Sequence, residues 1–514
     1  MIRAVQRLAR SNDGNVAIIF GLTVIPFLVM AGYGLDMGRA IVVRERLSHA
    51  LDAAILAVGA APYLNDEEAQ ELGEQFFAAN FGDTIMGSAY DITVTIEEEE
   101  VFMSARADVP TTLLALINQD FIEVYQEAGA VRGGIDLELV MVLDNTGSMS
   151  GSKITTLRNA AEDAVEILFN SGGSDPEAVK VALVPFAATV NVGSAFERAW
   201  WLDAEAASPL HAPAHNFSEP VNRWDLFDEL EVDWGGCVET RAAPHDIEDT
   251  TPTLGDPETL FVPYFQPDVP GDKGDARSGY SNDHSWLSDG DWEDLYDADN
   301  AYDTENEARQ ANVEKYYAGQ TPKWDGPNQQ CIDQAIVPLT TDEETLIEEI
   351  QDMEANGYTN IPNAAAWGIR VLSPTMPFDQ GRSYEDEELL KAMIILTDGD
   401  NVLDGQNNHN YSVYSSFGYV AEGRLGSNTY SDSTLTDRLD DKLEDTCEYA
   451  RGLGIRVYTI TFKVSGSDTR TLMEECASKG DSGDPLYWDS PSTSELNNAF
   501  RAIARDLVDL RLSK

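Results

Sequence analysis

An uncharged stretch near the N-terminus limits what this chain can fold into more than any other feature. The 22 residues from Gly14 to Leu35, GNVAIIFGLTVIPFLVMAGYGL, carry no charge, and about 20 apolar residues of helix span a bilayer core. Pro26 and four glycines weaken a helix in water but are tolerated in membranes. A secretory signal would have a shorter apolar region and a small-residue cleavage site. We therefore expect a retained span at about 14–35, with a buried core helix or a signal peptide as the alternatives.

Basic residues flank this span evenly. Arg3, Arg7 and Arg10 precede it, and Arg39, Arg44 and Arg46 follow it. Because the positive-inside rule counts lysine and arginine, the two flanks tie. The very acidic remainder of the chain favours the outer side of the membrane.

The charge of the whole chain excludes one class of partner. It has 90 acidic and 34 basic side chains and a formal charge of −56. Such a surface repels phosphate backbones, so we expect no nucleic-acid partner. Hydrophobic residues still make up 43% of the chain, so the acidity covers folded cores and does not indicate a disordered chain.

Beyond the span, the apolar residues keep a helical spacing to about Gly59. The stripe consists of Ile41, Leu47, Ala50, Leu51, Ala54, Ile55 and Val58. Residues 65–81 indicate a short capped helix, and the alternating runs 92–96 and 101–105 indicate paired strands around an acidic turn. Together with 122–131 they predict a small α+β module at 61–133. It follows a segment, 1–60, that holds a cytoplasmic tail, the span and the helix beyond it.

This N-terminal part resembles the TadE/TadG-like segment of Tad (Flp) pilus-assembly proteins. The matching residues are GNVAIIF at 14–20, GLDMGRA at 34–40 and LSHALDAAILAVGAA at 47–61. In pilin relatives a prepilin peptidase cuts after a glycine that usually has a glutamate five residues on, whereas Ile19 holds that position after Gly14. The resemblance implies a single-pass protein of the bacterial inner membrane, with a cytoplasmic N-terminus and its bulk in the periplasm or at the cell surface.

From Asp136 onward, apolar strands alternate with amphipathic helices. Strand patterns lie at 140–143, 179–184, 391–396 and 456–462, and a last helical pattern lies at 494–510. Uniformly apolar strands joined by such helices are typical of a parallel sheet covered on both faces. We predict an α/β domain with a doubly wound, mostly parallel sheet over 134–195 and 340–514.

Residues 196–340 interrupt this alternation. They are rich in Asp, Pro, Gly and aromatic residues. They hold seven of the nine tryptophans: Trp200, Trp201, Trp224, Trp234, Trp286, Trp292 and Trp324. A structureless segment of this length is uncommon in a compact fold, so we predict an acidic, inserted subdomain with little regular secondary structure. The tryptophans suit its core and a binding surface equally well.

Four cysteines are too few for a disulfide scaffold but enough for two bridges. Cys237 and Cys331 both lie in the insertion, whereas Cys447 and Cys476 flank the strand at 456–462. Two pairs, each within one structural unit, fit an oxidising compartment. Free buried thiols are the alternative, and four cysteines allow three connectivities.

The sequence DNTGSMS at 144–150 follows one of these strands directly and precedes a helix. Asp144, Thr146 and Ser148 place a carboxylate and two hydroxyls at the edge where open α/β sheets bind ligands. Two further oxygen donors occupy equivalent places, Thr359 at the start of a helix and Asp398 at the end of a strand. Hard oxygen ligands suit Mg²⁺, which prefers six of them in octahedral geometry.

These three pieces, in this order, resemble the metal-ion-dependent adhesion site of von Willebrand factor A domains. That motif is D-x-S-x-S, then a threonine, then an aspartate. Thr146 replaces the first serine and keeps its hydroxyl. The resemblance implies a bound Mg²⁺, or alternatively Mn²⁺ or Ca²⁺. The hydroxyls coordinate this ion directly, and the two aspartates contact it either at closer range or through water. The resemblance also implies an open position for an acidic group of a partner. Taken singly, each piece is equally explained as a turn or a helix cap.

Other chemistries fit the sequence less well. Lys153 is separated from the preceding glycine by Ser152 and is not followed by Ser or Thr, unlike the lysine of a phosphate loop. His211 and His215 lack the glutamate of a metalloprotease. The acidic cluster at 289–299 lacks EF-hand spacing, so we interpret it as a solvated loop.

We therefore predict a membrane-anchored component of a Tad pilus assembly system that binds a protein partner through a cation, alongside other pilus-assembly components. The alternative is a surface adhesin that grips a host or surface ligand with the same site. An enzyme using the cation as a Lewis acid is disfavoured, because no general base lies near the motif beyond the aspartates themselves. An acidic partner group in a negative field requires either a basic rim on the partner or screening by salt.

Overall fold

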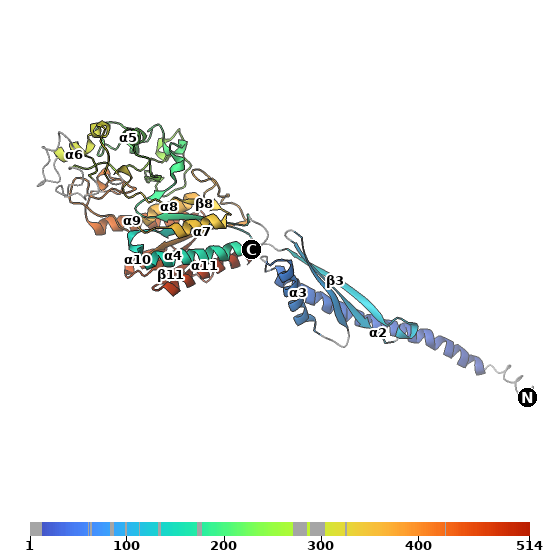
Figure 1. The fold of residues 1–514 in the computed structure, drawn as a ribbon. Helices are drawn as coiled ribbons and strands as arrows, with labels where there is room; N and C mark the ends of the chain where they lie inside the picture. The colour runs from blue at the N-terminus through green and yellow to red at the C-terminus, as the bar shows by residue number, and fades with distance from the viewer. Residues whose placement is uncertain are drawn as a thin grey trace, which may run out of the picture. The chain divides into compact units, whose positions relative to one another are not determined.

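The structure is a computed structural model. It describes residues 13–59, 61, 64–82, 87–97, 100–112, 114–131, 135–171, 177–270, 285–287, 304–323, 326–426 and 428–513. These residues form two compact units that meet in the sequence between Gly134 and Ile135 (Figure 1). Each unit has a hydrophobic core of its own.

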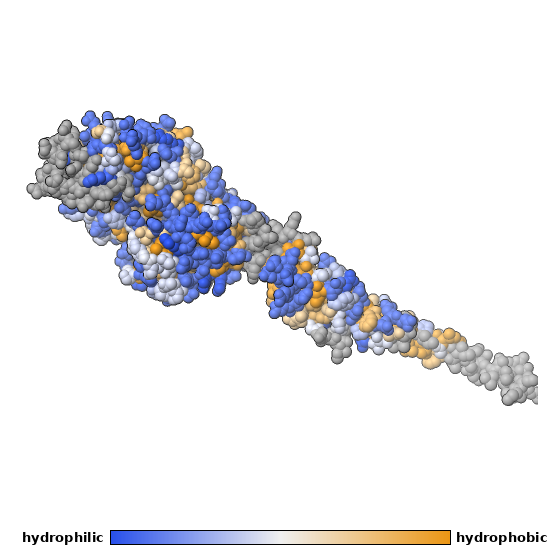
Figure 2. Space-filling view, viewed as in Figure 1, coloured by the Kyte–Doolittle hydropathy of each residue, from blue (hydrophilic) through white to orange (hydrophobic). Residues whose placement is uncertain are grey.

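One long helix dominates the first unit. Helix α2 runs from Asp13 to Gly59 and includes both the uncharged stretch and the predicted helix beyond it. Within the described residues it is the one helix long and apolar enough to cross a membrane. Large apolar side chains are exposed along its first half: Ile19, Phe20, Leu22, Phe27, Leu28, Met30, Tyr33 and Leu35. Figure 2 shows this half as an apolar surface.

The second half of α2 packs on a small antiparallel sheet. The elements are α3 (Asp66–Phe81), β1 (Ser88–Glu97), β2 (Glu100–Pro110), η1 (Leu114–Ile117) and β3 (Phe121–Val131), with strand order β1-β2-β3. Asn65 caps α3 by accepting from two backbone N–H groups, and Glu68 completes the capping box. The predicted capped helix and paired strands are thereby confirmed. The predicted stripe on α2 is buried except Ile41, which is 59% exposed; Val43 enters the core instead.

Asp36 lies in the GLDMGRA segment of α2 and is buried. Its carboxylate accepts hydrogen bonds from the backbone N–H groups of Thr112 (3.0 Å) and Leu114 (3.1 Å). Arg39, one turn further on, donates to the Thr112 hydroxyl at 2.5 Å. These bonds fix the connection between β2 and β3 against the helix, which gives the polar residues of this segment a structural role.

The second unit is built on a six-stranded mixed sheet in the order β11-β10-β9-β4-β5-β8. Its strands are β4 (Asp136–Asp144), β5 (Val179–Phe186), β8 (Val337–Thr340), β9 (Leu389–Thr397), β10 (Arg456–Phe462) and β11 (Tyr487–Ser490). Neighbouring strands are parallel except β8, which pairs antiparallel with β5. The predicted α/β fold and its four strands are confirmed. The edge strands β8 and β11 are too short, at four residues each, to show a sequence pattern.

Alternate residues of the central strand β4 enter two different cores. Val140 and Val142 face one core, and Leu139, Met141 and Leu143 face the other. Helices α4 (Ser152–Asn170), α7 (Glu343–Asp352) and α11 (Thr493–Ser513) close the second of these cores. Helices α8 (Ile361–Leu372), α9 (Asp432–Gly452) and α10 (Ser467–Cys476) contribute to the first.

A layer with little regular structure completes the first core. We call the described residues of 187–336 and 399–426 the irregular subdomain. It contains the helices α5 (Arg223–Leu230) and α6 (Thr304–Ala311), the short strands β6 (Val190–Asn191) and β7 (Cys237–Val238), and several 3-10 turns. In Figure 1, α5 and α6 lie on the side of the sheet opposite to α4 and α11. Arg370 of α8 holds this layer by donating to the backbone carbonyls of His245 (3.1 Å) and Asp246 (2.7 Å).

The tryptophans of this layer are mostly core residues. Trp201, Trp224, Trp234 and Trp286 are each at most 3% exposed and belong to the same core as Val142 of the sheet. Trp200 is 46% exposed. Trp292, Trp324 and the acidic cluster at 289–299 lie outside the described residues. Four buried tryptophans therefore serve the core rather than a binding surface.

Both predicted disulfides are present. Cys237 is bonded to Cys331 and Cys447 to Cys476, with Cα–Cα distances of 5.6 and 5.2 Å. The first bridge joins β7 to the segment before β8, so it closes 94 residues of the irregular subdomain. The second joins α9 to α10 across 29 residues.

Candidate metal-binding site

Parallel pairing brings two distant aspartates together at one edge of the sheet. Strand β4 ends at Asp144, and its neighbour β9 ends one residue before Asp398, with Leu143 opposite Leu396. The carboxyl ends of parallel strands share an edge, so residues 254 positions apart become neighbours. The Asp398 backbone N–H donates to Asp144 Oδ2 at 3.4 Å.

Asp144 is fully buried and held on both carboxylate oxygens. Oδ1 accepts from the Thr146 N–H and Oδ2 from the Thr397 hydroxyl, both at 2.8 Å. Burial, and then the charge of Asp398, raise the pKa of Asp144 to about 6, although the bonds from Thr146 and Thr397 oppose this rise. Asp144 forms no ion pair with a described residue, so a bound cation would stabilise the charged form of this carboxylate.

Two hydroxyls extend this polar group toward solvent. The 3-10 turn η2 (Gly147–Met149) places the Thr146 and Ser148 hydroxyls 2.9 Å apart. The Ser148 hydroxyl also donates to Asp398 Oδ1. Thr146 is buried whereas Ser148 is exposed, so the group opens to solvent on the Ser148 side.

The loop that carries Thr359 lies directly beside this turn. The Gly147 N–H donates to the Gly357 carbonyl at 3.0 Å, and the Asn356 N–H donates to the Asn145 carbonyl at 2.7 Å. Gly357 has a φ of +84°, which favours glycine at this contact. Thr359 is 4% exposed. The fifth predicted donor therefore lies on a loop that is hydrogen-bonded to the segment carrying Asp144, Thr146 and Ser148.

Lys153 and Thr397 are two contacts of the site that the sequence motif does not reveal. The Lys153 ammonium, from the first turn of α4, lies 2.5 Å from Asp398 Oδ2. Its partner is 245 residues away in the sequence, so only the fold makes it a counter-ion. Thr397 precedes Asp398 directly, and this adjacency is the one sequence signal of its contact with Asp144.

The donor set fits a small divalent cation. Two carboxylates and three hydroxyls offer hard oxygen atoms only, which suits Mg²⁺ together with water ligands. The described residues contain no group of three or more His, Cys, Asp or Glu side chains arranged to hold a metal. A metal bound at this edge would therefore depend on the hydroxyls as well as the aspartates.

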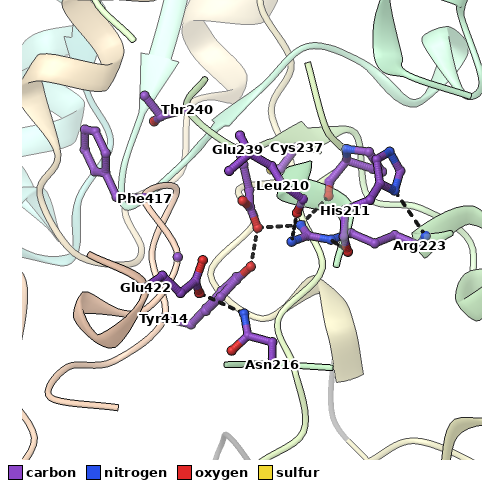
Figure 3. Close-up of polar contacts among 12 residues, drawn as sticks. Leu210, His211, Asn216, Arg223, Cys237, Glu239, Thr240, Tyr414, Phe417 and Glu422 are labelled. Carbon is purple, nitrogen blue, oxygen red and sulfur yellow. Dashed lines mark hydrogen bonds and ion pairs between the residues drawn. The ribbon is translucent and has the colours of Figure 1, made fainter. Parts of the chain in front are cut away.

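A buried ionic network braces the segment that follows Asp398. Glu239 accepts from Arg223 at 2.5 Å and from the Tyr414 hydroxyl, and its other oxygen pairs with Arg424 at 2.7 Å. Figure 3 shows Glu239 between Arg223 and Tyr414. Tyr414 and Arg424 belong to 399–426, whereas Arg223 and Glu239 belong to the insertion. The network therefore joins the two parts of the irregular subdomain.

A second buried carboxylate lies next to this network. Glu422 accepts from the Asn216 amide at 2.8 Å (Figure 3). Burial, and then the nearby Glu239 carboxylate, raise the pKa of Glu422 to about 7. The two histidines noted in the sequence have separate partners, since His211 contacts Asp203 and His215 contacts Asn410. They do not form a common site.

Comparison with known families identifies the N-terminal segment. Residues 14–61 match the family model described as Tad, putative Flp pilus-assembly TadE/G-like. The resemblance predicted from 14–20, 34–40 and 47–61 is confirmed for this segment. None of the curated protein sequences matches the chain.

Solved structures give weak overall likenesses. The vWF domain of the type V pili tip protein Mfa5 from Porphyromonas gingivalis has 9% identity and a TM-score of 0.32, over 73% of this chain and 95% of that one. The pilus adhesin SpaC from Lactobacillus rhamnosus GG has 10% identity and a TM-score of 0.32, over 81% of this chain and 34% of that one. Proximal thread matrix protein 1 from the mussel byssus, with a zinc-occupied MIDAS motif, has 11% identity and a TM-score of 0.28, over 74% and 46%. This chain thus spans about a third of the SpaC adhesin.

Proposed function

We propose that this protein is a membrane-anchored component of a bacterial Tad (Flp) pilus assembly system. It binds a protein partner through a divalent cation held by Asp144, Thr146, Ser148, Thr359 and Asp398. The pilus assignment rests on the family match of residues 14–61. The metal assignment is supported by the neighbouring buried carboxylates of Asp144 and Asp398 and by the Thr146 and Ser148 hydroxyls, with Thr359 on the adjoining loop.

The second unit acts, in this proposal, as a von Willebrand factor A domain with a doubly wound sheet, interrupted by the insertion at 196–340. Its cation is Mg²⁺, or Mn²⁺ or Ca²⁺, and an acidic group of the partner completes the coordination. Exposure of Ser148 supports an open side for that group. The role is adhesive rather than catalytic.

Helix α2 provides the anchor. Its apolar first half crosses the inner membrane once, with the N-terminus in the cytoplasm and the remainder in the periplasm or at the surface. Two disulfides support an oxidising compartment for the second unit. The helix thus holds a metal-dependent binding domain where pilus components assemble.

Pilus formation in the host bacterium tests this function. The chromosomal gene is replaced by Asp144→Ala or by the control Asp445→Asn, which removes one exposed charge from α9. We expect Asp144→Ala to lower the number of surface pili while its level in the membrane stays normal, and the control to form pili normally. Normal pili in Asp144→Ala cells would contradict the proposal. Normal pili with lost attachment would favour the surface-adhesin alternative.

A further inference from the structure

The three-stranded sheet of the first unit has one long edge without a partner strand. Its order is β1-β2-β3, so β3 is an edge strand. It pairs with β2 along all 11 of its residues, and no other described strand or bridge residue pairs with it. In an antiparallel pair, every second residue directs its N–H and C=O groups away from the neighbour. The open edge of β3 therefore presents a row of backbone donors and acceptors that a further strand can use.

The opposite edge of the same sheet is closed by a side chain. The Gln70 amide of α3 donates to the Ile92 carbonyl of β1 at 2.9 Å and accepts from the Val94 N–H at 2.7 Å. These two bonds replace those that a neighbouring strand would make to β1. Proteins also protect edge strands with lysine, proline and bulges, but 121–131 contains no lysine or proline, and its register with β2 is unbroken. One edge is thus capped, whereas the other is open along its whole length.

Partly buried apolar side chains line the open edge on the side that faces α2. The inward side chains of the central strand β2 are at most 1% exposed. Those of β3 are only partly buried: Ile122, Val124, Ala128 and Ala130. Ile41 of α2 is 59% exposed and lies three residues before Arg44, whose guanidinium donates to the Gln126 side chain of β3 at 3.4 Å. Because residues three apart share one side of a helix, a strand added to β3 would cover Ile41 as well.

Antiparallel pairing of two copies of β3 conflicts with the proposed membrane anchor. Helix α2 and β3 run in the same direction, since Asp36 accepts from the Leu114 N–H before β3 begins, and Arg44 contacts Gln126 in its middle. Two copies joined by antiparallel β3 strands would therefore point their apolar spans in opposite directions. One membrane with a fixed orientation of the chain does not accommodate both.

The other pairings between copies are also unfavourable. Parallel pairing of two β3 strands turns one sheet over, so its polar outer face, with Glu123 and Glu127, would continue the apolar face of the other. Pairing of β3 with β1 of a second copy meets Gln70, which already occupies that edge. The strand that fits the open edge therefore belongs to a different protein.

The outer face of β3 favours a basic partner residue. Glu127 is exposed, accepts from the Tyr125 hydroxyl at 2.9 Å and forms no ion pair with a described residue. Glu123 is already paired with Arg106 at 2.7 Å, and Arg106 is the one basic residue of the three strands. Opposite charges on neighbouring strands attract each other. A lysine or arginine on the outer face of an added strand would complement Glu127.

We propose that the open edge of β3 receives an extended segment of another protein, which adds a fourth strand to this sheet. Its apolar residues lie on the α2 side, next to Ile41, and alternate with basic or neutral polar residues on the outer side, next to Glu127. Backbone hydrogen bonds provide affinity and the alternation provides specificity. This surface needs no cation, so it is separate from the candidate metal site. The exclusion of a second copy rests on the membrane anchor proposed above.

A peptide of alternating valine and lysine tests this pairing. It is capped, carries a fluorophore and is added to the full-length chain in detergent micelles. A scrambled peptide of the same composition keeps the charge but loses the alternation. We expect the alternating peptide to bind about tenfold more tightly, because only its strand covers the apolar side chains while its backbone pairs with β3. Fluorescence polarisation measures both affinities, which should be the same in Mg²⁺ and in EDTA.

Methylation of the peptide backbone separates strand pairing from attraction between charges. Successive residues of a strand direct their N–H groups to opposite sides, so N-methylation of the valines alone, or of the lysines alone, removes donors from one side only. One of these two peptides should lose affinity by about tenfold and the other should keep it. Equal affinities of the two methylated peptides, or of the alternating and scrambled peptides, would overturn the proposal.

Matched protein variants locate the binding. Ala128→Lys places a charge on the inward side of the open edge, as natural edge strands do, and should weaken binding of the alternating peptide about tenfold. Thr95→Lys adds the same charge to an exposed position on β1 and should leave binding unchanged. Thermal unfolding checks that Ala128→Lys folds, and the methylated peptides test the unaltered chain in any case. Unchanged binding in folded Ala128→Lys, or loss of binding in EDTA, would overturn the open edge as the site. Neither result bears on whether the proposed metal site binds Mg²⁺.

Discussion

The two faces of the six-stranded sheet are closed by different means. On one face, the helices α4, α7 and α11 bury periodic apolar residues. On the other, the irregular subdomain adds buried tryptophans, a disulfide across 94 residues and a buried ionic network. The first face is thus covered by helices whose apolar residues follow a local sequence pattern. Much of the second face depends on contacts between residues that are far apart in the sequence. The candidate metal-binding residues lie at the edge of the sheet that both faces share. We therefore expect a destabilising substitution on either face to affect the site, through different contacts in each case.

Removing the long-range disulfide should be the largest single disturbance. The chain-entropy model gives about 4.7 kcal/mol for a closed segment of 94 residues and about 3.6 kcal/mol for one of 29. We therefore expect Cys237→Ser/Cys331→Ser to lose more stability than Cys447→Ser/Cys476→Ser. Thermal unfolding of the full-length chain in detergent measures both. Equal losses would show that the irregular subdomain does not depend on its bridge more than the helices depend on theirs.

The same arginine substitution on the two faces should have unequal effects. Arg223→Met leaves Glu239 buried with less compensation, and breaking a buried pair costs about 3–5 kcal/mol. Arg501→Met removes an exposed pair with Asp163 between α11 and α4, which should cost at most about 1 kcal/mol. Unfolding midpoints of both variants check this. A comparable loss of stability in Arg501→Met would show that the two faces do not differ in their dependence on ion pairs.

Stability should depend on pH through Glu422 of the irregular subdomain. Its pKa is raised to about 7 from 4.5, so the folded state binds the proton more tightly than the unfolded state. The favourable contribution of Glu422 to the free energy of unfolding is fully present below pH 4.5 and is lost as pH rises through 7. Glu422→Gln keeps an acceptor for Asn216 and stays neutral. It should therefore exceed the wild type by about 1–3 kcal/mol at pH 8 and match it near pH 4. A difference independent of pH would contradict this origin.

Lys153→Met should have a clear effect on metal affinity. The Lys153 side chain is 26% exposed, and its ammonium lies 2.5 Å from Asp398 Oδ2, so it competes with a cation for the same carboxylate. Lys153→Met should strengthen Mg²⁺ binding several-fold, because a like charge is removed from the site. Calorimetric titration measures this change, and Lys180→Met on β5 is a control for loss of a lysine. Unchanged or weaker Mg²⁺ binding in Lys153→Met would show that the ammonium does not repel the bound cation.

The regular face was the more predictable one, for physical reasons. Strands β4, β5, β9 and β10 are mostly apolar, and such runs can be recognised in the sequence without knowledge of the fold. Asp144, Thr146 and Ser148 were identifiable because they form one short motif after a strand. Thr359 and Asp398 required resemblance to a known domain, because their sequence positions alone fit a cap or a turn equally well.

The rest of the site depends on contacts that no local pattern encodes. Lys153 meets Asp398 across 245 residues, and Arg223 in the insertion shares Glu239 with Tyr414 from a segment about 190 residues later. A cleft beside Asn145 forms where the segment before β8 meets the loop after α7. Composition indicated an irregular subdomain, and the positions of the cysteines indicated its disulfide. Only the fold shows which charged side chains of this subdomain form ion pairs.

The central claim is that five oxygen donors at the sheet edge bind a divalent cation. Calorimetric titration of Mg²⁺, and separately of Mn²⁺, into the full-length chain in detergent tests it most directly, with Asp144→Ala as the variant and Asp445→Asn as the control. The account predicts one saturable site in the wild type and in Asp445→Asn, and no binding in Asp144→Ala. Absence of binding in the wild type, or equal binding in Asp144→Ala, would contradict it.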